Sequence, residues 1–116
     1  MRALIWFFAP LISWVFAHMS FAIPMKRLKE TDTLLVFYHP KPSYPFHVLL
    51  VPKKVVVSLK ELDSNDAAFL TDLYSVVQSL VEEFHLAAYR LIVNGGEYQD
   101  FPQLHFHLVS ESPAIT

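Results

Sequence analysis

The sequence predicts an α+β fold, in which an antiparallel sheet of about five strands carries one long helix on one face. Apolar residues recur with helical spacing between residues 69 and 84, and short apolar runs typical of strands lie on either side of this stretch. The chain holds only two glycines, at 95 and 96, which argues against a jelly roll with its many tight turns. Its 116 residues suffice for one hydrophobic core and are too few for two.

The first two strands are predicted at residues 34–38 and 47–51. Between them, three prolines within residues 40–45 predict a rigid extended loop. Further extended segments are predicted at residues 55–57, 89–93 and 104–109.

The long helix is expected to begin at Asp63 or Ser64 as N-cap, with Asp66 in its first turn, and to end near His85. Its apolar positions follow i, i+3, i+4 and i+7 spacing and therefore form one stripe that packs on the sheet. They are Phe69, Leu70, Leu73, Val76, Val77, Leu80, Val81 and Phe84.

Residues 3–25 form an uncharged apolar run, about as long as the roughly 20 residues that span a bilayer. Three alternatives remain: a membrane anchor, a helix packed on the domain or in a dimer interface, and a cleavable signal peptide. We therefore divide the chain into an apolar N-terminal segment, 1–25, and a domain, 26–116.

Basic residues after the run outnumber those before it, which for an anchor predicts a domain on the cytoplasmic side. We expect a cytoplasmic protein, either free or anchored to that face of a membrane. The net charge of −2 excludes the basic excess of a nucleic-acid-binding protein, so no nucleic-acid partner is expected. Without cysteine the chain has no disulfide, no thiolate zinc site and no cysteine nucleophile.

The chemistry is expected near the C-terminus, in Gln103-Leu104-His105-Phe106-His107-Leu108. Side chains alternate along a strand, so Gln103, His105 and His107 share one face, spaced about 7 Å apart. A glycine turn after Asn94, followed by Gln99 and Asp100, can bring backbone N–H groups to the same face and cradle an anion. An imidazole beside such a cradle can attack phosphorus or donate a proton.

Two other interpretations of these residues stay open. The histidines can simply cap a half-exposed sheet. Alternatively His47, His105 and His107 can hold a zinc ion, which needs three protein ligands and one open position.

The strand resembles the signature of the histidine triad (HIT) family, His-φ-His-φ-His-φ-φ, where φ is apolar. The resemblance covers roughly residues 20–110 and includes four other segments in the family's order. They are Ile23-Pro24, Pro45 to Lys54 with its Pro-x-His-φ-φ-φ-φ-Pro-Lys pattern, Ser58 to Leu62, and Tyr89 to Asn94.

The resemblance implies a nucleotidyl hydrolase or transferase that cleaves a phosphoramidate or phosphoanhydride through a covalent nucleotidyl-histidine. It makes His105 the nucleophile, His107 the contact to phosphate and leaving group, Asn94 a phosphate-side residue and His47 the support of the strand. Nucleotides or other small phosphate compounds are the expected ligands, with no cofactor and no metal. A homodimer is expected from the family.

Three residues depart from the family pattern. Gln103 replaces the first histidine and cannot titrate. His39 stands where a carboxylate usually holds the ribose, and Asp100 stands where a small hydroxyl residue faces the phosphate. These departures leave a second function open, a phosphate- or nucleotide-binding module with weakened catalysis.

Overall fold

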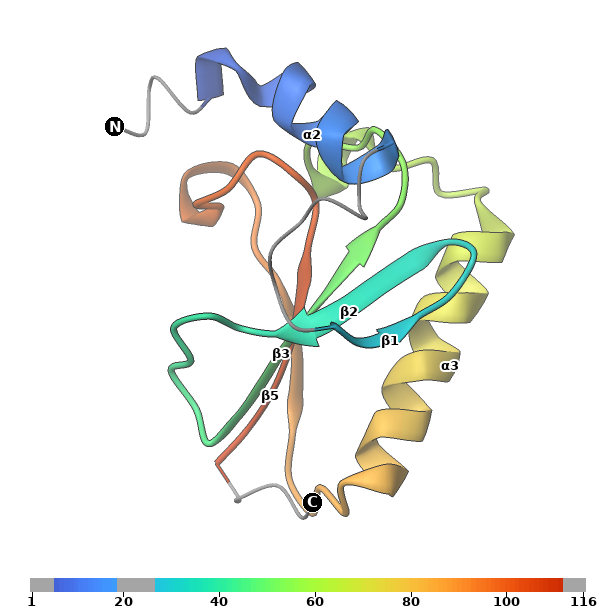
Figure 1. The fold of residues 1–116 in the computed structure, drawn as a ribbon, viewed down its shortest axis with the longest axis vertical. Coiled ribbons are helices and arrows are strands. Elements are labelled where there is room, and N and C mark those ends of the chain that lie inside the picture. Colours follow the sequence, from blue (N-terminus) through green and yellow to red (C-terminus); the bar gives the residue numbers. More distant parts are fainter. Residues whose placement is uncertain (1–5, 19–26, 112–116) are drawn as a thin grey trace.

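The computed structural model describes residues 6–18 and 27–111, and its five strands form one antiparallel sheet in the order β1-β2-β3-β5-β4 (Figure 1). The long helix α3, Ala67–Glu83, runs along one face of the sheet, and a shorter helix α2, Ala9–His18, lies at one end. The α+β fold class is thereby confirmed. The strands are β1 Arg27–Glu30, β2 Leu34–Tyr38, β3 Phe46–Pro52, β4 Arg90–Val93 and β5 Phe106–Ser110.

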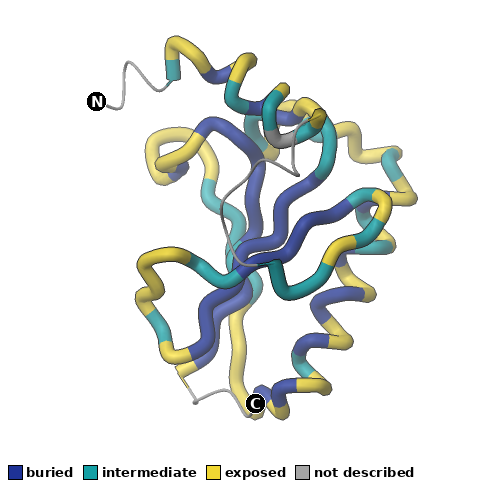
Figure 2. Tube along the Cα trace, in the orientation of Figure 1, coloured by how far each residue is buried: buried dark blue, intermediate teal, exposed yellow. Residues whose placement is uncertain are grey.

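Both faces of the sheet are buried at β2 and β3, where alternate residues enter two separate apolar clusters (Figure 2). The face toward α3, here called the helix face, carries the larger cluster. Its sheet members are Leu34, Val36, Phe46, Val48, Leu50, Phe106 and Leu108. The opposite face, here called the site face, carries Leu35, Phe37, His39, His47, Leu49, Val51, His105 and His107.

The helix α3 begins later than expected, because Asp66 is its N-cap and not Asp63 or Ser64. The Asp66 carboxylate accepts the N–H of Phe69 and pairs with Lys54. Both contacts hold the pKa of Asp66 below its ordinary value. After the helix His85 adopts a left-handed φ of 53°, a conformation that stops the helix.

Three extended segments differ from the sequence prediction. The edge strand β1 was not anticipated, because Arg27-Leu28-Lys29-Glu30 is polar and an edge strand needs few apolar residues. Residues 55–57 form no strand, and the carbonyl of Val56 accepts the N–H of Leu104 outside the sheet. The last strand begins at Phe106 rather than at Leu104, whose N–H donates to the carbonyl of Val56.

The described part of the N-terminal apolar run is helix α2, which packs on the site face through Ile12 and Ser13. This matches the packed-helix alternative for that part of the run. Within 6–18 and 27–111 no helix has the length and apolarity that crossing a bilayer requires. The other predictions on residues 3–25 lie partly outside the described residues.

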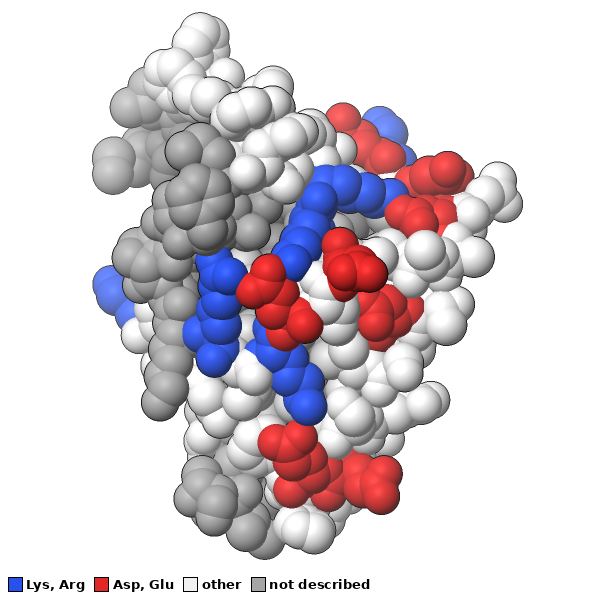
Figure 3. Space-filling view, turned by 45° about the vertical axis from the view of Figure 1, so that its right-hand side comes forward, with Lys and Arg blue, Asp and Glu red and all other residues white. Residues whose placement is uncertain are grey.

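Charged side chains of both signs alternate on the face shown in Figure 3. Ion pairs join Lys29 of β1 to Glu83 of α3 at 3.1 Å, and Lys53 to Glu30. Lysines and carboxylates therefore neutralise each other on this face, and no cationic surface forms there.

Candidate functional site

A pocket of about 290 Å³ opens on the site face, next to the predicted nucleophile His105. Apolar side chains make most of its wall, and four polar residues face it. The apolar residues are Phe37, Pro40, Leu49, Val51 and Phe101, and the polar ones are His39, Asp100, Gln103 and His105.

The His105 ring is held in one tautomer by the main chain. Its Nδ1 lies 2.7 Å from the carbonyl oxygen of Gln103. Because a carbonyl can only accept, Nδ1 carries a proton, and in the neutral ring Nε2 holds the free lone pair. Nε2 lies 3.7 Å from a carboxylate oxygen of Asp100, whose side chain is 87% exposed. His105 is only 9% exposed, and its neutral tautomer directs the nitrogen with the lone pair toward Asp100 at the pocket.

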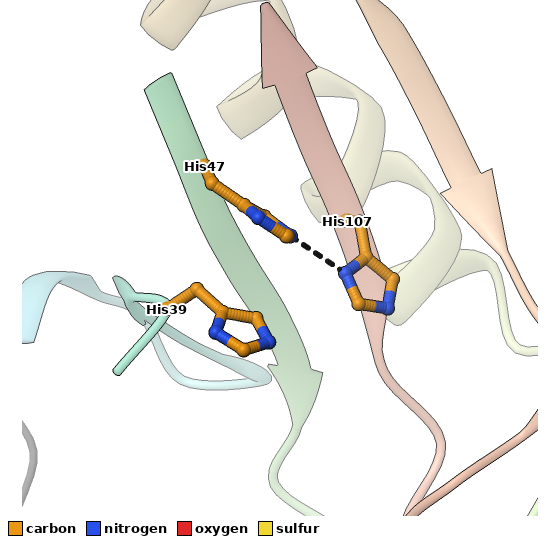
Figure 4. Close-up of side chains that lie close together, drawn as sticks. All are labelled: His39, His47 and His107. Carbon is orange, nitrogen blue, oxygen red and sulfur yellow. Dashed lines mark hydrogen bonds between the residues drawn. The ribbon is translucent and has the colours of Figure 1, made fainter. Parts of the chain in front are cut away.

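A hydrogen-bonded pair of histidines, His47 on β3 and His107 on β5, lies beside His105 (Figure 4). The N–H of Ser43 donates to Nδ1 of His47 at 3.1 Å, which places the His47 proton on Nε2. That Nε2 lies 2.9 Å from Nδ1 of His107, so His107 accepts there and carries its own proton on Nε2. The Nε2 of His107 is buried and has no hydrogen-bond partner among the described residues.

The rings of His47 and His107 are both neutral at physiological pH. Burial, followed by repulsion from neighbouring histidines, lowers the pKa of His47 and that of His107 to about 4. The buried N–H of His107 is therefore a donor for a ligand that brings an acceptor atom, such as a phosphoryl oxygen.

His39 completes a three-histidine cluster with His47 and His107 (Figure 4). Its ring lies 4.4 Å from that of His47, centroid to centroid, and its Nδ1 accepts the N–H of Lys41 at 2.9 Å. Burial lowers the pKa of His39, partly offset by the charge of Asp100. Neutral His39 therefore carries its proton on Nε2 and is a hydrogen-bond donor.

The cluster has the composition of a metal site, since one ligand atom from each ring lies within 4.8 Å of the others. A metal ion needs an unprotonated nitrogen from each histidine. Backbone N–H groups occupy Nδ1 of His39 and of His47, so in both rings the remaining nitrogen is protonated. The tautomers thus favour a ligand with acceptor atoms over a cation.

The predicted row of three side chains on one open face is interrupted at Gln103. The irregular backbone before β5 turns this side chain inward, and only 1% of it is exposed. Its amide binds Ser13 of α2 and the carbonyls of Pro52 and Lys54. Gln103 touches the pocket wall, but its polar atoms are directed into the protein.

The three predicted phosphate-side residues, Asn94, Gln99 and Asp100, differ in burial and in their contacts. Gln99 is 1% exposed, and its amide donates to the carbonyls of Val57 and Phe101, so it holds the loop in shape. Asn94 follows β4, where continuing the ladder from Val93–Phe106 puts it opposite His105. Asp100 lines the pocket.

The sequence did not predict that Ser13 binds Gln103, nor that His39 lies in one cluster with His47 and His107. Ser13 is a polar residue in an apolar run, and this contrast was the available signal. His39 lies at the end of a strand whose odd-numbered residues face the same way as His47, which predicts their proximity once the register is known.

Comparison with known proteins places this geometry in a family. A family model described as HIT domain matches residues 20–114. An uncharacterized 13.2 kDa HIT-like protein of Azospirillum brasilense is 31% identical over 91 residues, covering 74% of this chain and 75% of the relative. A histidine triad protein from Clostridium difficile superposes with a TM-score of 0.76 at 26% identity, covering 88% of this chain and 93% of that one. A HIT family hydrolase from Clostridium thermocellum gives 0.73 at 26% identity, covering 91% and 96%.

Proposed function

We propose that this chain, which belongs to the histidine triad (HIT) family, is a nucleotidyl hydrolase or transferase with His105 as nucleophile. The observation that carries the proposal is the tautomer of His105. The Gln103 carbonyl holds the proton on Nδ1 and leaves the lone pair of Nε2 available beside the pocket.

In the first step Nε2 of His105 attacks phosphorus, a phosphorus–nitrogen bond forms, and the bond to the leaving amine or phosphate breaks. The ring becomes cationic, and its Nδ1–H bond to the Gln103 carbonyl strengthens as charge develops. This hydrogen bond is therefore worth more in the transition state than in the free protein.

His107 assists the leaving group. A neutral imidazole is a poor acid, but a bound phosphate anion raises the pKa of a nearby histidine and favours uptake of a proton from solvent. The His47–His107 pair then passes that proton to the leaving group through Nε2 of His107.

In the second step water attacks phosphorus and releases His105. The neutral His47–His107 pair accepts a proton from this water, and the phosphorus–nitrogen bond to His105 breaks. In a transfer reaction another nucleophile takes the place of water. We propose that Asn94 and the loop at Gln99 and Asp100 flank the phosphate.

The substrate we propose is a nucleoside phosphoramidate or a phosphoanhydride such as a dinucleotide. The apolar wall of the pocket suits a base or another flat apolar group. A second candidate is a binding module with weakened turnover. The Asp100 carboxylate near Nε2 of His105 favours it, because its charge opposes the placement of a phosphate at the nucleophile, while the apolar wall can still hold the rest of a ligand.

The test is adduct trapping. Protein is mixed with a panel of nucleoside phosphoramidates and dinucleotides, quenched in alkali and examined by mass spectrometry. We expect a nucleotidyl group on His105 and none in His105→Ala. Turnover that is equal in His105→Ala would refute the nucleophile, and ligand-induced thermal stabilisation without product would favour the binding module.

We also propose a homodimer and, for helix α2, contact with a membrane surface. Within the described sheet β4 is an edge strand with half-buried Leu91 and Ile92, which a second copy could pair. Leu11 on α2 is 57% exposed, and Phe7, which precedes the helix, is 76% exposed. Light scattering tests the dimer, co-sedimentation with vesicles tests the membrane contact, and cell fractionation tests the proposed cytoplasmic location.

A further inference from the structure

The side chain of Gln103 connects three separate segments. Its Oε1 accepts the hydroxyl of Ser13 on α2, and its Nε2 donates to the carbonyls of Pro52 at 3.1 Å and Lys54 at 3.0 Å. Ser13 is fully buried. Because both N–H groups and the oxygen of the amide have partners, Gln103 ties α2 to the end of β3 and to the chain entering β5.

The main chain of the same residue is fixed as well. The N–H of Gln103 donates to the carbonyl of Phe101 at 3.0 Å, and the next N–H, of Leu104, donates to Val56 at 2.9 Å. The Gln103 carbonyl is the acceptor for Nδ1 of His105 at 2.7 Å. Rotating this carbonyl would break the bonds on either side of it, so the contacts of residue 103 determine which nitrogen of His105 is protonated.

We propose that Ser13 and Gln103 form a positioning pair, through which helix α2 holds His105 in its nucleophilic tautomer. The inference rests on the proposed function, because it concerns the same nucleophile. Neither side chain directs a polar atom at the reacting phosphorus, so both act through His105.

The pair also explains why residue 103 is glutamine. A neutral imidazole has one N–H and one acceptor nitrogen, whereas the neighbours of residue 103 need two donors and one acceptor. An imidazolium has two donors but no acceptor. A histidine at 103 would leave at least one of Ser13, Pro52 and Lys54 without its hydrogen bond in a buried place, which is costly.

The kinetic test uses Ser13→Ala, Gln103→His and their double variant. We expect kcat to fall about tenfold in Ser13→Ala and about a hundredfold in Gln103→His, with KM changed less than about twofold, because only the orientation of the nucleophile is affected. In Gln103→His the Ser13 hydroxyl is one of the groups that can lose its hydrogen bond, and Ser13→Ala removes that hydroxyl. The double variant should therefore be less impaired than the sum of the two single losses predicts.

Ser110→Ala is the matched control. Its hydroxyl is buried at the far end of β5, the strand that follows His105, and donates to the carbonyl of Ala88 at 2.6 Å. We expect a similar loss of stability with kcat unchanged. A gain of kcat in Gln103→His, or equal kcat effects of Ser13→Ala and Ser110→Ala, would overturn the positioning pair.

A readout without turnover separates this inference from the proposed function. In ¹⁵N-histidine-labelled protein, the two ring nitrogens of His105 report directly which one is protonated. We expect the Nδ1–H form in the wild type and a mixture of forms in Ser13→Ala, with Ser110→Ala like the wild type. A wild type that shows this pattern but turns over no substrate would refute the function and keep the pair, whereas an unchanged tautomer in Ser13→Ala would refute the pair.

Discussion

The two faces of the sheet are held together by different kinds of interaction. On the helix face, α3 and the sheet meet in a cluster of sixteen buried residues that are all apolar. On the site face, the apolar cluster has four buried residues, and directed hydrogen bonds among histidines, Gln103 and Ser13 continue it. Apolar contact has no preferred direction, whereas a buried hydrogen bond works only with the right partner at the right place.

This difference predicts that stability and activity can be separated by mutation. Losses on the helix face should appear in the free energy of unfolding and leave the chemistry of the folded protein intact. Losses on the site face should appear first in kcat.

Phe69→Ala tests the helix face and has the largest expected effect. Phe69 is 1% exposed and packs near Phe106, so the free energy of unfolding should fall by about 3 to 5 kcal/mol. Urea unfolding measures the loss. At a temperature where the variant is folded, kcat should stay within about twofold of the wild type. A kcat that falls with the stability would show that the two faces are coupled.

His107→Asn is the corresponding test of the site face. The variant loses the buried Nε2–H and the acceptor of His47, so kcat should fall about 10²- to 10⁴-fold. The free energy of unfolding should fall by less than about 2 kcal/mol. His85→Gln, at an exposed histidine beyond α3, is the control and should match the wild type. Normal turnover in His107→Asn would remove this residue from the mechanism.

The same contrast explains how far the sequence alone could reach. The helix face follows from apolar periodicity, so α3, β2 and β3 were predicted close to their observed positions. The motif also placed His105 and His107 on one face. Such patterns are local, and local spacing is what a sequence displays.

The supports of the site escaped prediction because they join distant segments. Ser13 and Gln103 are 90 positions apart, and His47 and His107 are 60 apart. Gln103 was expected on an open strand, but the backbone before Phe106 is irregular, so the alternation rule did not apply to it. The N-cap is Asp66, whose carboxylate both accepts the N–H of Phe69 and pairs with Lys54 of another segment, and the second contact is not visible in the local sequence.

Acid should weaken the site face first. The pKa of His47 and of His107 is about 4 in the folded protein and about 6.5 in an unfolded chain. Between these values the unfolded state binds more protons, so the free energy of unfolding should decrease as pH falls from about 6.5 to about 4. We expect a loss on the order of 3 kcal/mol in total, reduced from the full linkage value because His107 is only half-buried.

Urea unfolding at several pH values measures this loss. A His47→Gln/His107→Asn double variant should lose less stability over the same range. Equal pH dependence in the wild type and the double variant would assign the loss to other groups.

Asp100→Asn has the smallest expected effect and tests whether the Asp100 carboxylate weakens the binding of an anionic substrate. The carboxylate lies 3.7 Å from Nε2 of His105, where the phosphate would bind, and it is 87% exposed. Removing its charge should lower KM for an anionic substrate about two- to threefold in about 20 mM salt, and solvent keeps the effect small. In about 0.5 M salt the difference should nearly vanish. Glu97→Gln, in the same loop but outside the pocket wall, should change KM less. An unchanged KM in Asp100→Asn would mean that the carboxylate moves away when phosphate binds, and the alternative of a binding module with weakened turnover would then lose its structural basis.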